Sequence, residues 1–204
     1  MLKTIKKVIG LILKNFSVLL ILFVLFANNG LRAQEAEKKF IGFIDSLEGS
    51  VNIEKEDVDD LIELKEFDQI FTNDKIKIGP NASVVVSFID NSILTLQSDS
   101  VFLVEKFDKI SEEPSFIIAI TKGKFAFESG TIAKNDKGIM KVNLGEMEID
   151  LEASAIIGSI FEKKSEVSMV PKTTGGNNPI TICADGECIT ITEPHTGVEF
   201  SSEL

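Results

Sequence analysis

The stretch SVVVSFIDNSILTL, residues 83–96, decides the fold class of this chain. In its first half Val84, Val86 and Phe88 alternate with other residues, so that all three would lie on one face of an extended strand. The turn-forming sequence IDNS follows, and ILTL then resumes the alternation as a returning strand. The stretch therefore predicts a β-hairpin whose apolar face, which includes Leu94 and Leu96, is turned towards a core.

The same period of two continues from residue 40 onward, in short apolar runs separated by Gly, Asp, Asn and Pro. Residues 116–120 and 124–128 are predicted to form a second hairpin that turns at Thr121-Lys122-Gly123, with Phe125 and Phe127 on one face. Two segments, Glu54–Phe67 and Leu151–Phe161, are compatible with either helix or strand. Further strands are predicted at residues 41–44, 50–54, 75–78, 140–144, 146–151, 155–161 and 166–170. The pattern predicts an all-β fold, either an antiparallel β-sandwich or a solenoid-like stack of sheets.

Residues 1–33 are typical of an export signal. They carry five basic residues and no acidic one, and an apolar run from Phe16 to Phe26 is followed by Asn28-Asn29-Gly30 and the small residue Ala33. We expect cleavage after Ala33, which makes Gln34 the first residue of an exported, periplasmic or cell-surface protein. The alternative is an uncleaved membrane-anchor helix, since the mostly apolar residues from Val8 to Ala27 are enough to span a bilayer. The protein would then contact the membrane only through this segment.

Removing residues 1–33 takes away five basic residues, which leaves 16 basic and 32 acidic residues and a net charge of −16. A surface this acidic repels phosphate backbones and anionic head groups, so nucleic acid and lipid surfaces are not expected partners. Trp and Tyr are absent, which counts against a carbohydrate-binding module because such sites usually rely on those rings. The remaining length suits one β domain at residues 40–170, with a terminal hairpin and tail at 171–204.

The sequence ITICADGECITIT, residues 180–192, is symmetrical about its centre, so that Cys183 faces Cys188 across a predicted hairpin. Opposed β-carbons in a non-hydrogen-bonded pair lie near disulfide distance, and export leads to an oxidising compartment. We therefore expect a structural disulfide. A redox-active pair is disfavoured because four residues separate the cysteines, and a zinc site is disfavoured because the chain has one histidine.

Two further features invite a functional interpretation. His195 has no recognisable serine or cysteine motif to act on, so we expect an exposed turn histidine and not a catalytic base. The acidic stretch Glu54–Asp60 lacks the spacing that places oxygens around one calcium ion, and we expect a solvated loop or helix face. No residue is predicted to be catalytic, metal-binding or cofactor-binding.

Residues 40–162 resemble the extracytoplasmic domain of the FecR family, and the resemblance lies in the order of several short motifs. A glycine-marked strand is followed by TNDKIKI, then by FIDNS, then by LTL with a serine turn, and later by GKFAFESG. The matching positions are Gly42, Gly49, Asp74, Ile76, Phe88, Asp90, Ser92, Leu94, Leu96, Ser100, Gly123, Phe125, Phe127, Ser129 and Gly130. We interpret the two aspartates and the turn glycines, with Gly79, as architectural residues that fix strand register.

The chain departs from the FecR pattern at two points. The family's I-R-G-T signature occurs here as Ile156-Ile157-Gly158-Ser159, so Ile157 stands where the family has arginine. FecR regulators also carry a cytoplasmic anti-sigma region before their membrane helix, whereas about 15 residues precede the apolar run here. The resemblance therefore implies a stand-alone exported domain and not a complete transmembrane regulator of a sigma factor.

We expect a non-enzymatic domain of the bacterial envelope that acts by binding an envelope protein or another ligand, in regulation, sensing or scaffolding, without a cofactor. The alternative is a β-sandwich hydrolase that acts on envelope polymers through two carboxylates about 5–9 Å apart. Two close, buried carboxylates in a cleft lined by aromatic rings would favour the enzyme. A solid sandwich with an exposed apolar patch would favour the binding domain.

Overall fold

The structure is a computed structural model that describes residues 39–55, 58–173 and 178–201. Lys38–Leu204 forms one compact unit, distinct from Met1–Glu37. The predicted export signal, with its expected cleavage site between Ala33 and Gln34, lies outside the described residues.

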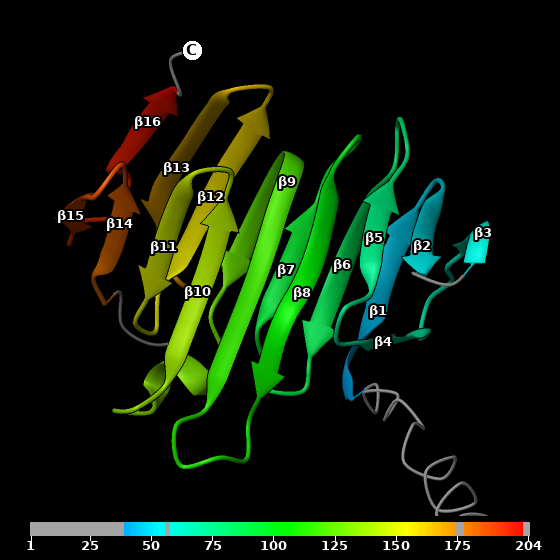
Figure 1. The fold of residues 1–204 in the computed structure, drawn as a ribbon, viewed down its shortest axis with the longest axis horizontal. Helices are drawn as coiled ribbons and strands as arrows, with labels where there is room; N and C mark the ends of the chain where they lie inside the picture. Colours follow the sequence, from blue (N-terminus) through cyan, green and yellow to red (C-terminus); the bar gives the residue numbers. More distant parts are fainter. Residues whose placement is uncertain (1–38, 56–57, 174–177, 202–204) are drawn as a thin grey trace, which may run out of the picture. The chain divides into compact units, whose positions relative to one another are not determined.

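The described residues confirm the all-β fold class, since they form strands and one short 3₁₀ helix, η1 (Ile132–Lys134). The strands lie in two sheets that share one long strand, β9 (Ser115–Glu128) (Figure 1). Sheet A has the order β4 (Gln69–Phe71), β1 (Phe40–Glu48), β6 (Ser83–Phe88), β7 (Ile93–Leu96), the second half of β9, β12 (Ala155–Phe161), β13 (Lys164–Val170) and β16 (Gly197–Ser201). Sheet B has the order β3 (Val58–Glu63), β2 (Val51–Lys55), β5 (Lys75–Ile78), β8 (Val101–Asp108), the first half of β9, β10 (Ile139–Leu144), β11 (Met147–Leu151), β14 (Ile180–Ala184) and β15 (Glu187–Ile191).

The hairpin that decides the fold class forms as predicted. β6 pairs with β7 in a register that places Val84 opposite Leu96 and Val86 opposite Leu94, and all four side chains are buried. Phe88 is buried on the same face, 3% exposed. Because a one-residue slip would turn every side chain to the other face, the alternation along β6 determines which face meets the core.

The inward faces of the two sheets enclose one apolar core. Phe88 of sheet A packs edge-to-face on Phe116 of sheet B, with 4.7 Å between the ring centroids. Phe116 also packs on Phe107 at 5.0 Å and on Phe127 at 5.9 Å. Aromatic contacts of this geometry stabilise the fold beyond the area that they bury. The two sheets are therefore the layers of an open sandwich, joined at its centre by a cluster of phenylalanines.

Strand β9 corrects the predicted second hairpin, because the chain does not turn back at Thr121-Lys122-Gly123. The first half of β9 pairs with β8 in sheet B, and its second half pairs with β7 and β12 in sheet A. Gly123 lies at this change of sheet with a φ of +99°, and a Cβ there would lie 2.0 Å from the Ser100 hydroxyl oxygen. The glycine therefore lets the strand pass from one sheet to the other. The shared face of Phe125 and Phe127 is confirmed, since both are buried.

Other predicted elements also differ from the structure. The segments Glu54–Phe67 and Leu151–Phe161 are not helical, since they contain β3 and β12. Strands β4, β8 and β16 have no counterpart in the sequence prediction. β8 alternates, but an irregularity between Val104 and Lys106 interrupts its period of two. Among the described pairings, β9 and β10 form a parallel one, which departs from the expected antiparallel pattern.

The C-terminal hairpin forms in the predicted register, with Cys183 opposite Cys188. The two cysteines form a disulfide with an S–S distance of 2.08 Å, which confirms the predicted bond. β14 pairs with β11, so the hairpin continues sheet B at one edge.

Candidate binding face

A buried polar cluster surrounds the FIDNS turn between β6 and β7. The Asp90 carboxylate accepts hydrogen bonds from the Ser92 backbone amide at 3.0 Å and from the Ser92 hydroxyl at 2.9 Å. The Gly130 amide donates to the Ser92 hydroxyl oxygen at 2.8 Å, which ties this turn to the end of β9. A Cβ on Gly130 would lie 2.2 Å from the Asp90 carbonyl oxygen, so the backbones approach too closely for a larger residue. Two motifs of the resemblance, FIDNS and ESG, thus meet in one structural cluster.

Lys172 extends this cluster towards the surface. Its Nζ donates to the Ser129 carbonyl oxygen at 2.6 Å and to the Ser129 hydroxyl oxygen at 3.2 Å. Partial burial, and then the charge of Lys134, lower the pKa of Lys172. A lysine beside a serine hydroxyl is one arrangement for nucleophilic catalysis. Here Ser129 is 2% exposed and its hydroxyl donates to the Ser154 carbonyl oxygen at 2.8 Å, so this hydroxyl is not placed to attack a substrate.

In the described part of the chain two carboxylates are buried, those of Asp74 and Asp90, and they lie in different turns. The Asp74 carboxylate accepts a hydrogen bond from the Phe71 amide at 2.9 Å, which closes the turn between β4 and β5. Asp74 lines a hollow of about 260 Å³ together with Phe71 and Asp68. Asp68 is half-buried, and its carboxylate accepts a hydrogen bond from the Lys65 amide at 2.8 Å. The carboxylates of this hollow therefore hold turns, and Asp68 is not a second buried acid.

The remaining motif residues serve packing. Ile76 lies in the core. A Cβ would lie less than 3.0 Å from a neighbouring atom at Gly42, Gly49 and Gly158. At Gly158 the nearest atoms belong to the Phe125 ring and to the Glu166 carbonyl, so this glycine makes room for the ring beneath the strand.

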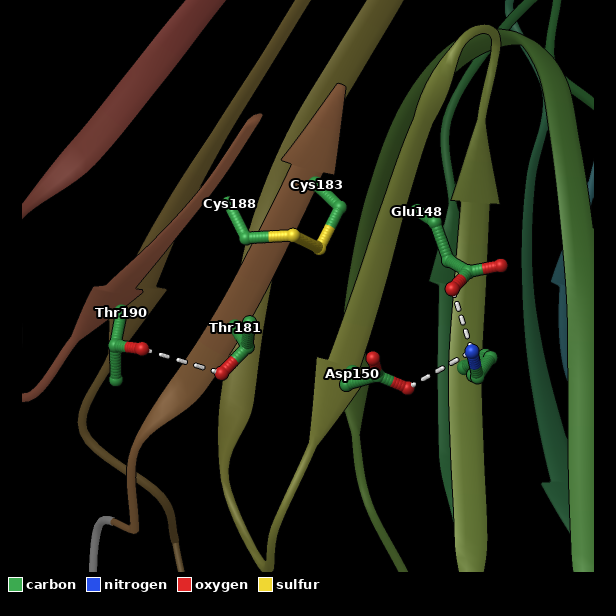
Figure 2. Close-up of a disulfide and its surroundings, with 7 residues drawn as sticks. Glu148, Asp150, Thr181, Cys183, Cys188 and Thr190 are labelled. Atoms are coloured by element: carbon green, nitrogen blue, oxygen red, sulfur yellow. Dashed lines mark hydrogen bonds and ion pairs between the residues drawn. A yellow bond between two sulfur atoms is a disulfide. The ribbon is translucent and has the colours of Figure 1, made fainter. Parts of the chain in front are cut away.

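The outward face of sheet B is crossed by paired polar side chains. Lys141 on β10 forms ion pairs with Glu148 and Asp150 on β11, with 3.4 Å to the Asp150 carboxylate (Figure 2). The hydrogen bond to Glu148 is the main cause that raises the pKa of Lys141. Asn143 on β10 donates to Glu105 on β8 at 2.9 Å, and β9 lies between these two strands. These pairs contribute little stability when exposed, but they give each of these side chains a partner within the chain.

The disulfide lies on the same outward face of sheet B. Figure 2 shows it next to the Thr181–Thr190 pair, whose hydroxyl oxygens are 3.3 Å apart. The disulfide and the Thr181–Thr190 pair each join β14 to β15, and together they hold the edge strand β15 to the sheet. Cys188 is exposed on this edge.

The outward face of sheet A differs in its central row. Strand register places five uncharged residues side by side on neighbouring strands. From β6 to β13 they are Val85, Thr95, Ala126, Ile157 and Ser168. Ile157 is 46% exposed and Ile93, in the next row, is 42% exposed. We call the outward residues of β6, β7, β9, β12 and β13 the sheet A face.

A hollow of about 410 Å³ lies in the sheet A face, and its lining includes Ala126, Ser159, Gln97 and Lys124. Ile157, which stands where the resembled family has arginine, also lines it. The Ser159 hydroxyl donates to the Glu166 carboxylate at 2.8 Å at the border of this hollow. Small side chains, such as Ala126, and longer side chains, such as Gln97 and Lys124, line it together.

The outward residues of the sheet A face were not among the sequence-predicted site residues, although two of those predicted residues, Gly158 and Phe125, line its hollow. Its members come from five strands between residues 83 and 170, so no short motif contains them. A signal was present in the sequence, because Ile93 and Ile157 are apolar residues at positions that alternate with buried ones.

A second group of exposed apolar side chains lies at the β3–β4 end of the sandwich. Phe67 is 72% exposed, Leu61 52%, Ile62 41% and Phe40 37%. The chain next to this group in sequence, residues 1–38 and 56–57, lies outside the described residues.

His195 is exposed in a turn with a φ of +65°, and its amide donates to the Met169 carbonyl oxygen at 2.7 Å. Glu54, at the start of the acidic stretch, pairs with Lys75 at 3.0 Å and Lys77 at 2.8 Å.

In the part of the chain that the structure describes, no group of three or more His, Cys, Asp or Glu side chains is placed to hold a metal ion. Within the same ranges no helix has the length and apolar character needed to cross a membrane.

No protein family profile matches this chain, and no curated protein matches its sequence. Two crystal structures of a candidate anti-sigma factor from Parabacteroides distasonis, at 2.50 and 1.65 Å resolution, match with a TM-score of 0.49 and 10% identity each. The match covers 62% of this chain and 54% of the crystallised one, so this chain spans about half the length of that protein. Similarity at this level carries no conclusion about activity or partners.

Proposed function

We propose that this chain is an exported, non-enzymatic binding domain of the bacterial envelope, of the FecR type, and that the sheet A face is its binding surface. One observation carries the proposal: an uncharged row with an exposed isoleucine crosses five strands of a domain whose expected net charge is −16. Exposed apolar surface of this kind marks sites of contact with other molecules. Its role would be regulatory, sensing or scaffolding.

The order of the sequence motifs supports the FecR assignment, and so does the way two of them meet around Asp90. The hydrolase alternative finds less support. The hollow lined by the buried Asp74 carboxylate has one aromatic ring, that of Phe71, among its described lining residues. No second buried acid is among them.

The binding face is tested by a matched pair of variants. Ile157→Glu places a charge on the sheet A face, and Ile139→Glu places the same charge on sheet B at a residue of similar exposure, 41% against 46%. We expect Ile157→Glu to weaken capture of the envelope partner by at least about tenfold, since burying an unpaired carboxylate is costly. Ile139→Glu should leave it unchanged. Quantitative pull-down from envelope extracts with the tagged exported domain measures both, and equal behaviour of the two variants would exclude this face.

Export is tested separately. We expect protein recovered from the periplasm or cell surface to begin at Gln34, because the basic head, apolar run and small residue match a cleaved signal. N-terminal sequencing of the exported protein reads this directly. Accumulation of intact 22.4 kDa chains in the membrane fraction would instead establish the anchor alternative.

A further inference from the structure

We propose that the partner of the sheet A face is a second copy of this chain, packed face to face about a twofold axis that runs along the central row, Val85 to Ser168. This inference rests on the proposed function, because it names the occupant of the same surface. A symmetric dimer of this kind requires a surface that is complementary to itself.

The two charges that flank the central row on β9 meet this requirement in one orientation. Lys124 and Glu128 lie on β9, two residues before and two residues after Ala126 of the central row, and both point outward with it. An axis along that row, perpendicular to the strands, lays β9 antiparallel over β9 of the second copy. Lys124 of each copy then lies opposite Glu128 of the other, so that two ion pairs form.

The alternative twofold axis, parallel to the strands through Ala126, gives the opposite result. It lays β9 parallel over β9 of the second copy and places Lys124 opposite Lys124 and Glu128 opposite Glu128. Like charges in these positions repel, so the charge pattern selects the first axis.

The same axis also brings the uncharged residues of the two copies against each other. Each residue of the central row meets its own copy, so Ile157 packs on Ile157 of the second copy and Thr95 on Thr95. Ile93 of one copy falls on the row that contains Gln97, which borders the hollow. The central row carries no charge, so association does not desolvate an ion along it. The net charge of the chain opposes association, and salt at about 0.15 M screens that long-range repulsion.

The first test measures the oligomeric state of the exported domain by sedimentation equilibrium at about 0.15 M salt. We expect a reversible dimer. Lys124→Glu should raise its dissociation constant at least about tenfold, and Glu128→Lys added to it should reverse most of that rise, because the pair is then re-formed with the charges exchanged. Lys122→Glu, an exposed lysine on the sheet B half of the same strand, makes the same charge change and should have no effect. Thermal unfolding of each variant checks that it is folded.

The second test measures proximity. The described residues contain no free cysteine, so a single introduced thiol can be cross-linked with a short bismaleimide. Thr95→Cys, in the central row, should give covalent dimers. Thr121→Cys, on the sheet B part of β9, should give none.

Three outcomes separate this inference from the proposed function. A dimer that Lys124→Glu weakens and that Thr95→Cys cross-links supports the inference. A monomer at every concentration whose envelope partner is lost in Ile157→Glu, but not in Ile139→Glu, overturns self-association and keeps the binding face. A dimer that Lys124→Glu leaves intact overturns the proposed axis.

Discussion

Replacing Phe88 with alanine is expected to lower the free energy of unfolding by about 3–5 kcal/mol, a large share of the 5–15 kcal/mol that usually holds a domain folded. The ring is 3% exposed and packs edge-to-face on Phe116 across the two sheets. Its removal leaves a cavity between the sheets. It also loses the free energy that is gained when the ring is transferred from water to the core. The midpoint of chemical denaturation measures the change.

Ser87→Ala is the control for this prediction. Ser87 is the neighbouring residue on β6 and points to the sheet A face, so its replacement should cost less than about 0.5 kcal/mol. Equal, small shifts of the two denaturation midpoints would contradict the orientation of β6, and with it the placement of the sheet A face.

Asp90→Ala is expected to cost roughly 3 kcal/mol, because its carboxylate accepts two hydrogen bonds from Ser92 and both side chains are fully buried. Hydrogen bonds to a charged group contribute about 1.5–3 kcal/mol each, and their loss leaves buried donors without an acceptor. Ser92→Ala should also destabilise, since it removes the acceptor of the Gly130 amide. Because the two side chains act in one network, the double variant should cost less than the sum of the single ones.

Asp45→Ala serves as the control, since this aspartate on β1 is exposed, and its replacement should change the unfolding midpoint little. Denaturant unfolding of the four variants supplies the measurement. A loss at Asp90 as small as that at Asp45, or strict additivity of Asp90→Ala and Ser92→Ala, would show that the cluster does not hold the β6–β7 turn to the end of β9.

The sequence by itself determined the elements whose signal is local. The alternation of residues 83–96 predicts the β6–β7 hairpin, its register and its buried face, and the symmetry around Cys183 and Cys188 predicts the disulfide hairpin. In both cases the two strands are joined by a short turn, so the residues that pair are close in sequence and a period of two is enough to align them.

Tertiary structure alone decided where strands far apart in sequence meet. Thr121-Lys122-Gly123 has the composition of a turn, yet the chain continues through it as one strand, because pairing with β8 before Gly123 and with β7 and β12 after it outweighs the local preference. The sheet A face arises in the same way. Its central row joins residues from Val85 to Ser168 through four strand pairings, and no local pattern can specify contacts that depend on the pairing of the whole sheet.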